Sequence, residues 1–327
     1  MSCNPHGGVH HLRSHRIAVV GSYATGLTMR VQRFPSPGET VLAKGYRVDF
    51  GGKGSNQAVA CARLGAKVSF IAKIGQDNFG GMALSLHREQ RVDIDSVIQV
   101  PGQPTGVGFI VVDADGNNCI TIDPGANDLL TADEVSQSLK TLTPEAVVLT
   151  QLEIPVEAAA AAMARGREKR ALTILNPAPA RTLPDSVLRL VDVLTPNQSE
   201  AKVLVGQSPD AAMEPEAAAQ ELLRRGVKQV VITQGDRGAL IATADSSRHI
   251  PAIKVSAEDT TGAGDSFNAG LAVALSCGEN LDDAVRFAVV TGGLAVTREG
   301  VVPSLPTRNE VLRFYRQQDQ TPPIWLS

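Results

Sequence analysis

Short apolar runs rich in β-branched residues alternate with longer Ala-rich amphipathic segments through most of this sequence. The apolar runs cover 17–20, 68–71, 147–152, 172–175, 191–194 and 230–233. The helical patterns cover 56–64, 80–90, 156–169, 214–225, 263–276 and 281–296. The apolar runs lack a polar alternation, which is typical of strands buried on both faces. The sequence therefore predicts an α/β fold, with a central, mostly parallel sheet and helices on both of its faces.

Two regions interrupt this alternation. Residues 40–50 have an extended pattern, and residues 106–112 and 118–122 form a predicted hairpin with its turn at 113–117. Strands without crossover helices fit poorly into a parallel sheet, so we expect a small antiparallel β-sheet beside it, with strands from about 22–50 and 100–123. Ligands bind at the carboxyl ends of parallel strands, so this small sheet is expected to cover a ligand site as a lid.

Composition excludes several classes of function. The 327 residues carry a formal net charge of -3 and no long block of Lys or Arg, which argues against a nucleic-acid partner. No stretch reaches the roughly 18 apolar residues of a membrane span. The 4 cysteines lie far apart, without metal-ligand spacing, which favours reduced thiols in a cytoplasmic protein.

The first 16 residues hold four of the 6 histidines, in an irregular segment that also contains Gly and Pro. A metal-binding tract is one interpretation, but this composition favours a disordered leader. We therefore expect a leader at 1–16, one α/β domain at 17–315, and a C-terminal tail at 316–327.

The segment Asp-Thr-Thr-Gly-Ala-Gly-Asp at 259–265 leads into a predicted helix. Gly262, Ala263 and Gly264 let the backbone approach a ligand, and free N–H groups at the helix start would form an anion hole. Asp265 has two interpretations. It is either a charge partner for the start of its own helix or a general base beside a transferred phosphoryl group.

A second glycine-rich loop, Gly-Gly-Lys-Gly-Ser-Asn at 51–56, also precedes a helix. It matches neither a dinucleotide fingerprint nor a Walker loop. Lys53 and Asn56 are suited to hydrogen-bond a polyhydroxyl ligand, whereas the alternative is a plain tight turn.

Two further turns follow predicted strands. The segment at 195–200 is Thr-Pro-Asn-Gln-Ser-Glu. Its Asn197 and Glu200 are suited to hold the water molecules around a Mg²⁺ ion near nucleotide phosphates. The alternative is that Ser199 caps a helix and Glu200 is a first-turn charge. The turn at 233–238 lies at the expected ligand edge of the sheet.

Together these segments resemble the ribokinase-like (PfkB) family of sugar kinases. The resemblance is collinear from about residue 17 to 314. It includes the segments Phe-Pro-Ser-Pro-Gly-Glu-Thr at 34–40, Gln-Leu-Glu at 151–153, Asn-Pro-Ala-Pro-Ala at 176–180 and Val-Thr-Arg-Glu-Gly at 296–300. It implies an ATP-dependent kinase that phosphorylates a hydroxyl of a small sugar or polyol, under a β lid that often mediates homodimerisation.

The resemblance also implies roles for individual residues. Asp265 would be the base, with the anion hole at Gly262, Ala263 and Gly264. The sugar-binding residues would be Gly52, Lys53, Gly54, Asn56, Glu153 and Asp265. The ATP-binding residues would be Asn197, Thr233, Gly235, Asp236, Gly238, Gly264 and Val289. Mg²⁺ would lie near Glu200, and a monovalent cation, K⁺, would be surrounded by Asp259, Thr261, Ala295, Arg298, Gly300 and Ser304, many of them through backbone carbonyls.

One position departs from the family pattern. Family members that act on ribose carry Gly-Ser-x-Asn-x-Asp after the first strand, whereas this chain has Ala24 and Gly26 at the Asn and Asp positions. Losing both polar partners costs a diol-binding site on the order of several kcal/mol. We therefore expect poor use of ribose, and either a bulkier sugar or an acidic sugar as substrate.

Three alternatives remain at this point. A nucleoside kinase of the same family is disfavoured because only 4% of residues are aromatic, few for a base-stacking pocket. A non-catalytic sugar-binding protein would not need Asp265 in its anion hole. An NAD-binding domain lacks its glycine fingerprint.

Overall fold

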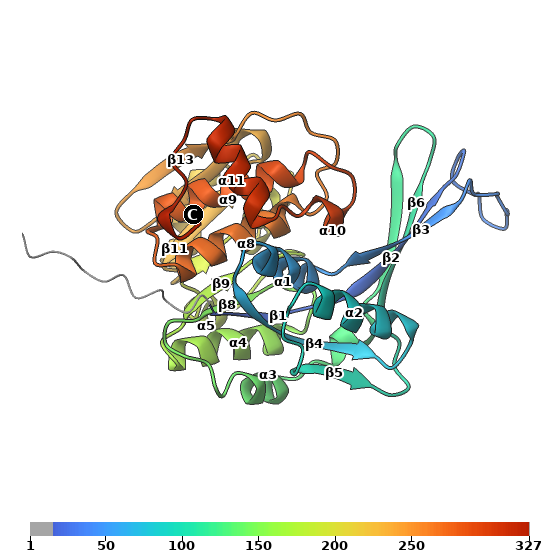
Figure 1. Cartoon of the computed structure of the whole chain (residues 1–327), viewed down its shortest axis with the longest axis horizontal. Helices are drawn as coiled ribbons and strands as arrows, with labels where there is room; N and C mark the ends of the chain where they lie inside the picture. The colour runs from blue at the N-terminus through green and yellow to red at the C-terminus, as the bar shows by residue number, and fades with distance from the viewer. Residues whose placement is uncertain (1–15, 327) are drawn as a thin grey trace, which may run out of the picture.

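Nine strands form the main sheet of the computed structural model, which describes residues 16–326 (Figure 1). Their order across the sheet is β13-β12-β11-β10-β9-β8-β1-β4-β5. The first seven along the chain are parallel, whereas β12 and β13 pair antiparallel at one edge. The strands are β1 (Arg16–Val20), β4 (Lys67–Gly75), β5 (Val97–Val100), β8 (Val147–Thr150), β9 (Leu172–Leu175), β10 (Val193–Leu194), β11 (Gln229–Thr233), β12 (Gly238–Ala242) and β13 (Ser247–Pro251). The predicted mostly parallel sheet is confirmed.

Helices cover both faces of this sheet (Figure 1). They are α1 (Lys53–Arg63), α2 (Asn78–Glu89), α3 (Ala132–Ser138), α4 (Val156–Glu168), α5 (Asp185–Leu188), α6 (Gln198–Leu204), α7 (Pro215–Arg224), α8 (Ala263–Ser276), α9 (Leu281–Ala295), α10 (Val301–Ser304) and α11 (Arg308–Gln317). Alternate residues of β1 enter different cores. Ile17 and Val19 pack with α1, α8 and α9, whereas Ala18 and Val20 pack on the side of α3, α4 and α7. This alternation explains why the strands read as continuous apolar runs.

A separate four-stranded sheet projects from the main sheet (Figure 1). We call it the lid; it comprises β2 (Ala24–Arg30), β3 (Tyr46–Gly51), β6 (Gly106–Val112) and β7 (Asn118–Asp123), in the order β3-β2-β6-β7. The β2–β3 and β6–β7 pairs are antiparallel as predicted, but β2 and β6 are parallel. The reason is topological. β2 continues from β1 and β6 follows β5, so both leave the same edge of a parallel sheet in the same direction.

Several boundaries differ from the sequence-based prediction. Residues 40–45 are irregular, so β3 begins only at Tyr46, and β10 is shorter than the predicted strand at 191–194. The edge strands β12 and β13 were not predicted, because β12 is a short segment with Gly and two Ala among its five residues and β13 is mostly polar.

The C-terminal segment does not behave as the predicted tail. The Trp325 ring packs against Phe287 with 4.9 Å between ring centroids, and its Nε1 donates to Oε1 of Glu279 at 2.9 Å. Leu326 is buried. The packed domain therefore extends to Leu326.

At the other end, Arg16 already belongs to β1, and the remaining residues of the predicted leader lie outside the described residues. Within 16–326, no helix is both long and apolar enough to cross a membrane.

Candidate active site

The loops that follow β1 and β8 meet the start of α1 at the carboxyl edge of the main sheet. The carboxylate of Glu153 joins them, because its Oε2 accepts from Ser22 Oγ at 2.6 Å and from the Lys53 backbone N–H at 2.8 Å. The Ser55 N–H donates to the Ser22 carbonyl at 2.8 Å. The predicted sugar-binding residues of the 51–56 loop and Glu153 are therefore brought together.

Gly52 allows this close approach. It caps the start of α1 with a φ of 84°, a backbone conformation that strongly favours glycine. A Cβ at this position would lie 2.7 Å from the Ala24 nitrogen. The loop is therefore packed directly against the first residue of the lid.

Asp265 lies at the third position of α8 and is only 7% exposed. Both of its carboxylate oxygens accept hydrogen bonds from α1. Asn56 Nδ2 donates to Oδ2 at 2.8 Å, and Gln57 Nε2 donates to Oδ1 at 3.0 Å. The side chain thus bonds to a neighbouring helix rather than to the amides of its own helix. Simple charge pairing with α8 does not explain this orientation.

A chain of buried amides continues behind Asp265. Gln151 Nε2 donates to Gln57 Oε1 at 2.5 Å, and Gln57 Nε2 also donates to Asn176 Oδ1 at 3.1 Å. Asn176 Nδ2 donates in turn to the Thr195 carbonyl at 3.1 Å. Gln57, Gln151 and Asn176 are absent from the predicted site residues, although all three lie in or beside the motifs that carry the resemblance. Three buried amides at strand ends and a helix start are the signal that was available.

Charge and burial act together on this site. Burial raises the pKa of Asp265, and this effect exceeds the opposing influence of the Lys53 charge and of the Asn56 and Gln57 donors. Burial alone would lower the pKa of Lys53, but the negative charges of Asp265, Glu153 and Glu200 outweigh it and leave that pKa raised. Burial also raises the pKa of Glu200. Lys53 is therefore a cation among three carboxylates.

Polar atoms in the site lack protein partners. Asn56 Oδ1 and Ser55 Oγ are buried, and neither has a hydrogen-bond partner within residues 16–326. Buried polar atoms normally have a partner, so these atoms are suited to bind hydroxyl groups of a ligand.

The start of α8 offers free backbone amides. Gly262 caps the helix with a φ of 81°, in the left-handed region that favours glycine. The Ala263 N–H donates to the Thr260 carbonyl at 3.2 Å, whereas the N–H groups of Gly262 and Gly264 have no acceptor in the described part of the chain. A Cβ on Gly264 would meet no atom within 4 Å, so this side of the turn faces open space. The predicted anion hole is therefore open at two of its three amides.

The predicted nucleotide segments also lie side by side. Asn197 and Thr233 form a parallel bridge, which places the 195–200 segment beside the turn at 233–238. Asn197 and Glu200 form a capping box at the start of α6, with both hydrogen bonds at 2.8 Å. The helix-capping interpretation therefore holds for this segment, but the cap is Asn197 and not Ser199. Asp236 lies in the 3₁₀ turn Gly235–Arg237, which ends at Gly238.

Val289, predicted beside adenine, lies on α9. It lines a pocket of about 770 Å³ together with Ile253 and Phe314. The pocket begins beside the end of β13, on the same edge of the sheet as Thr233.

The predicted cation residues join two loops. Oδ1 of Asp259 accepts from the Thr261 N–H at 2.9 Å, and its Oδ2 accepts from the Gly300 N–H at 3.0 Å. Burial alone would raise the pKa of Asp259, but the hydrogen bonds from Thr261 and Gly300 outweigh burial and leave that pKa lowered. The Arg298 guanidinium donates to Glu310 and to the Ser304 carbonyl, at 2.7 and 3.0 Å. The guanidinium has no acceptor atom, so only the backbone carbonyl oxygen of Arg298 is available to a cation. Ala295 is the last residue of α9, directly before this loop.

Among residues 16–326, no cluster of three or more His, Cys, Asp or Glu side chains is arranged to hold a metal ion. Glu200 is a single carboxylate near the start of α8. This fits Mg²⁺, which commonly binds one or two carboxylates together with waters and substrate phosphates.

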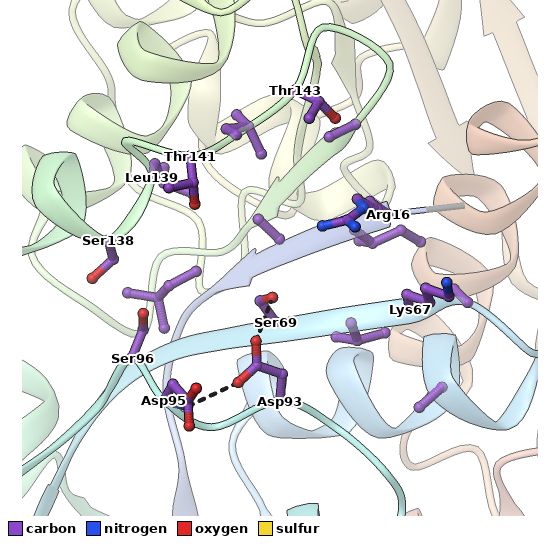
Figure 2. Close-up of a pocket in the computed structure, with 18 of the residues that line it drawn as sticks. Arg16, Lys67, Ser69, Asp93, Asp95, Ser96, Ser138, Leu139, Thr141 and Thr143 are labelled. Carbon is purple, nitrogen blue, oxygen red and sulfur yellow. Dashed lines mark hydrogen bonds between the residues drawn. The ribbon is translucent and has the colours of Figure 1, made fainter. Parts of the chain in front are cut away.

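Figure 2 shows a pocket of about 840 Å³ at the opposite edge of the sheet, lined by Arg16 and Lys67 where β1 and β4 begin. Both oxygens of Asp93 in this pocket are already bonded, to Ser69 Oγ and to the Asp95 N–H, each at 3.0 Å. Ligands of open α/β sheets bind at the carboxyl ends of the strands, whereas this pocket lies at the amino ends. We therefore place the active site around Asp265.

Comparison with known proteins shows the family of this chain. The family model described as "pfkB family carbohydrate kinase" matches residues 14–308. The chain is 37% identical to ribokinase of Haemophilus influenzae over 298 residues, which cover 91% of this chain and 97% of that protein. It is 34% identical to deoxyribokinase of Salmonella typhi over 292 residues, or 89% and 95% of the two chains.

A solved structure of ribokinase from Thermotoga maritima is similar with a TM-score of 0.83 and 36% identity, and the match covers 92% of this chain and 99% of that one. The chain belongs to the pfkB family of carbohydrate kinases and is an ATP-dependent sugar kinase.

Proposed function

We propose that this kinase transfers the γ-phosphoryl group of ATP to a hydroxyl of a small sugar or polyol, with Asp265 as the general base. The observation that carries the proposal is the placement of Asp265. It is buried, it is held by Asn56 and Gln57 from the sugar loop, and it lies at a helix start with free amides.

The acceptor binds between the 52–56 loop and Glu153. Lys53, Asn56 and the free edge of Glu153 hydrogen-bond its hydroxyl groups, while Gly52 and Gly54 keep the loop close to β1 and the lid. The site holds the acceptor hydroxyl beside Asp265 in a fixed orientation, so that the hydroxyl and ATP need not meet by diffusion. Such positioning is a main contribution of the protein to phosphoryl transfer.

In the reaction, the acceptor oxygen attacks the γ-phosphorus of ATP. A sugar O–P bond forms, the bond from the γ-phosphorus to the β,γ-bridging oxygen breaks, and the hydroxyl proton moves to the Asp265 carboxylate. The products are a sugar phosphate and ADP. Burial raises the pKa of Asp265, which makes it a better proton acceptor than an exposed aspartate, and the Lys53 charge opposes part of this rise.

The amides of Gly262 and Gly264 stabilise the charge on the phosphoryl oxygens. Thr233, Gly235, Asp236, Gly238 and Val289 bind the nucleotide, together with Asn197. Mg²⁺ would lie near Glu200 and would neutralise the negative charge of the phosphates.

We further propose that a monovalent cation, K⁺, orders the loops that Asp259 and Gly300 join. Its ligands would be carbonyl oxygens around Thr261, Ala295, Arg298 and Ser304, since the Arg298 side chain is engaged elsewhere. This position lies just before Gly262, so the cation would act by fixing the start of α8.

The acceptor differs from ribose in this proposal. Ala24 and Gly26 occupy the positions of two sugar-binding side chains in the family pattern, and they leave space at the lid. A deoxyribokinase and a ribokinase have nearly the same identity to this chain, so overall identity does not specify the acceptor. The space favours a sugar or polyol bulkier than ribose.

We propose that two copies associate through the lid. One of its faces carries Leu27, Met29, Tyr46, Val48 and Phe109, which the strand register places together. Tyr46 is 74% exposed and Phe109 48%. Clustered exposed apolar residues of this kind mark interaction surfaces. Light scattering should give a dimer for the wild type and a monomer for Phe109→Glu, whereas Ile324→Glu, at an exposed site on the main body, should remain dimeric.

A coupled ADP-release assay tests the reaction. It uses Mg·ATP and K⁺ with ribose, deoxyribose, other pentoses, ketohexoses, polyols, sugar acids and nucleosides, and Asp265→Ala as the blank. Turnover of a sugar or polyol that the blank lacks is the expected result. Turnover of nucleosides alone would favour a nucleoside kinase, and ligand binding without any turnover would favour a non-catalytic sugar-binding protein.

A further inference from the structure

Asp49 lies on the lid beside Gly26, the position at which this chain lacks the carboxylate of the family pattern. In the antiparallel β2–β3 pair, Gly26 is the direct partner of Asp49, and on its other side Gly26 pairs with Gly108. Directly paired residues point to the same face of a sheet. A Cβ built on Gly26 would lie 3.7 Å from the Cβ of Asp49. A side chain at position 26 and the side chain of Asp49 therefore reach the same region.

This face of the lid looks toward the active site. Ala24 lies on it two residues before Gly26, and Ala24 packs against Gly52 of the sugar loop. Further out, Arg47 lies on the same face and donates from Nη1 to Oε1 of Glu299 at 2.9 Å, which joins the lid to the loop before α10. The opposite face carries the exposed Tyr46 and Phe109, while Ile120 and Ile122 are exposed on the same face as Asp49.

On β2, the strand that pairs with β3, the direct partner Gly26 has no side chain, and Ile110 reaches across it from β6, with its Cδ1 3.6 Å from a Cβ built on Gly26. Oδ2 of Asp49 accepts from Arg47 Nε at 2.6 Å, and its Oδ1 has no hydrogen-bond partner in the described part of the chain. The Asp49 side chain is 27% exposed, so it is partly enclosed but accessible.

We infer that Asp49 is an acceptor-binding residue of this kinase, which holds a sugar hydroxyl from β3 where the family pattern uses an aspartate on β2. The inference rests on the proposed sugar kinase site and concerns its specificity. Oδ1 is the oxygen that accepts the hydroxyl proton, while the bond from Arg47 to Oδ2 fixes the carboxylate.

This placement changes the acceptor expected from the sequence alone. Losing the aspartate at position 26 suggested that an acidic sugar would escape repulsion. Asp49 returns a negative charge to that region, where Glu153, Asp265 and Glu200 are also acidic and the facing cations are Lys53, Arg47 and Arg30. Arg47 and Arg30 are engaged by Glu299. The site therefore favours a neutral polyhydroxyl acceptor over a sugar acid.

The test compares four variants by steady-state kinetics, with the acceptor that the wild type uses best in the panel above. Asp49→Ala should raise the KM for the acceptor about 10- to 100-fold, as expected for a hydrogen bond to a charged group, with KM for ATP within about twofold. Arg47→Gln keeps the carboxylate and removes its ion pair, so acceptor KM should change less than about threefold. Gly26→Asp alone should bind the acceptor worse than the wild type, because two carboxylates would be adjacent. The double variant Gly26→Asp/Asp49→Ala moves the carboxylate back to β2 and should restore most of the lost affinity.

The outcomes separate this inference from the proposed function. Normal acceptor KM in Asp49→Ala, with active wild type and an inactive Asp265→Ala blank, would overturn the role of Asp49 and leave the kinase intact. An equal loss in Arg47→Gln would also overturn it, since Asp49 would then act only through the ion pair that anchors the lid. A wild type that phosphorylates no sugar or polyol would overturn both. Thermal unfolding of each variant identifies any loss that comes from folding.

Discussion

Gln57 Nε2 donates a hydrogen bond to Asp265 Oδ1 at 3.0 Å, and the direction of this bond is fixed by a third residue. Gln151 Nε2 donates to Oε1 of the Gln57 side chain at 2.5 Å, so the Gln57 side-chain amide cannot rotate without losing that bond. A rotated amide would present its oxygen to the Asp265 carboxylate. The buried chain therefore keeps a donor, not an acceptor, facing the base.

Gln57→Met should lower kcat about 10- to 100-fold, because it removes a donor to a charged group in a buried site. Acceptor KM should change much less, since Gln57 touches the base and not the proposed sugar position. The Gln57 bond lowers the pKa of Asp265, so its loss should shift the acidic limb of the kcat/KM profile to higher pH. Steady-state kinetics across pH check both effects. The exposed Gln99→Met is the matched control, and an unshifted acidic limb in Gln57→Met would contradict this role.

Asp265→Asn should lower kcat by about 10²- to 10⁴-fold while acceptor binding persists, because general base catalysis contributes on that scale. Calorimetry with the acceptor and single-turnover kinetics measure the two properties separately. Asp133→Asn is a suitable control because Asp133 is an exposed acidic residue in the first turn of α3, outside the site. If both variants lost stability equally and Asp265→Asn kept its turnover, Asp265 would be only a charge partner of its helix.

Much of this arrangement was accessible from the sequence. The carboxyl ends of parallel strands meet at one edge, so the segments after β1 and β8 and the starts of α1 and α8 were expected to converge. Asn56, Glu153 and Asp265 do lie in that convergence. Local spacing was sufficient because each of these residues is within a few positions of a strand end or a helix start.

Other features depend on register, which local patterns do not encode. Gly26 and Asp49 are neighbours only through the pairing of β2 with β3, across the irregular segment that ends at Gly45. The role of Gln57 depends on its phase on α1, since a helix rotates by about 100° per residue and Asn56 and Gln57 reach Asp265 from different sides. Predicting that β2 and β6 pair in parallel would have required knowing where β5 ends.

Asp259→Ala should reduce activation by K⁺. The Asp259 carboxylate holds Thr261 and Gly300, so its loss releases both loops of the proposed cation site. We expect the wild-type rate of ADP release to rise severalfold when KCl replaces choline chloride at constant ionic strength. The response of the variant should be weaker and need more K⁺. Asp236→Ala, in the nucleotide turn, should change KM for ATP but keep the K⁺ response. An identical K⁺ response in wild type and Asp259→Ala would exclude this site.

His87 should make folding stability depend on pH. Its ring stacks on Phe70 with 4.6 Å between centroids, Nδ1 donates to the Ala83 carbonyl at 2.7 Å, and Nε2 is buried without a partner within residues 16–326. Burial lowers its pKa from 6.5 to about 4. Between those two values the unfolded chain binds a proton that the folded chain does not. The stabilisation is therefore complete above pH 6.5 and is lost as the pH falls toward 4.

The loss amounts to roughly 3 kcal/mol of unfolding free energy over that range. Urea unfolding at several pH values measures it. His87→Leu should flatten the dependence between pH 6.5 and 5, above the range in which most carboxylates titrate, whereas the exposed His249→Gln should leave it unchanged. The same slope in wild type and His87→Leu would mean that other groups carry the pH dependence. A reduced slope would instead show that this buried imidazole, packed under the first residues of the lid beside Tyr23, limits the stability of the fold in mild acid.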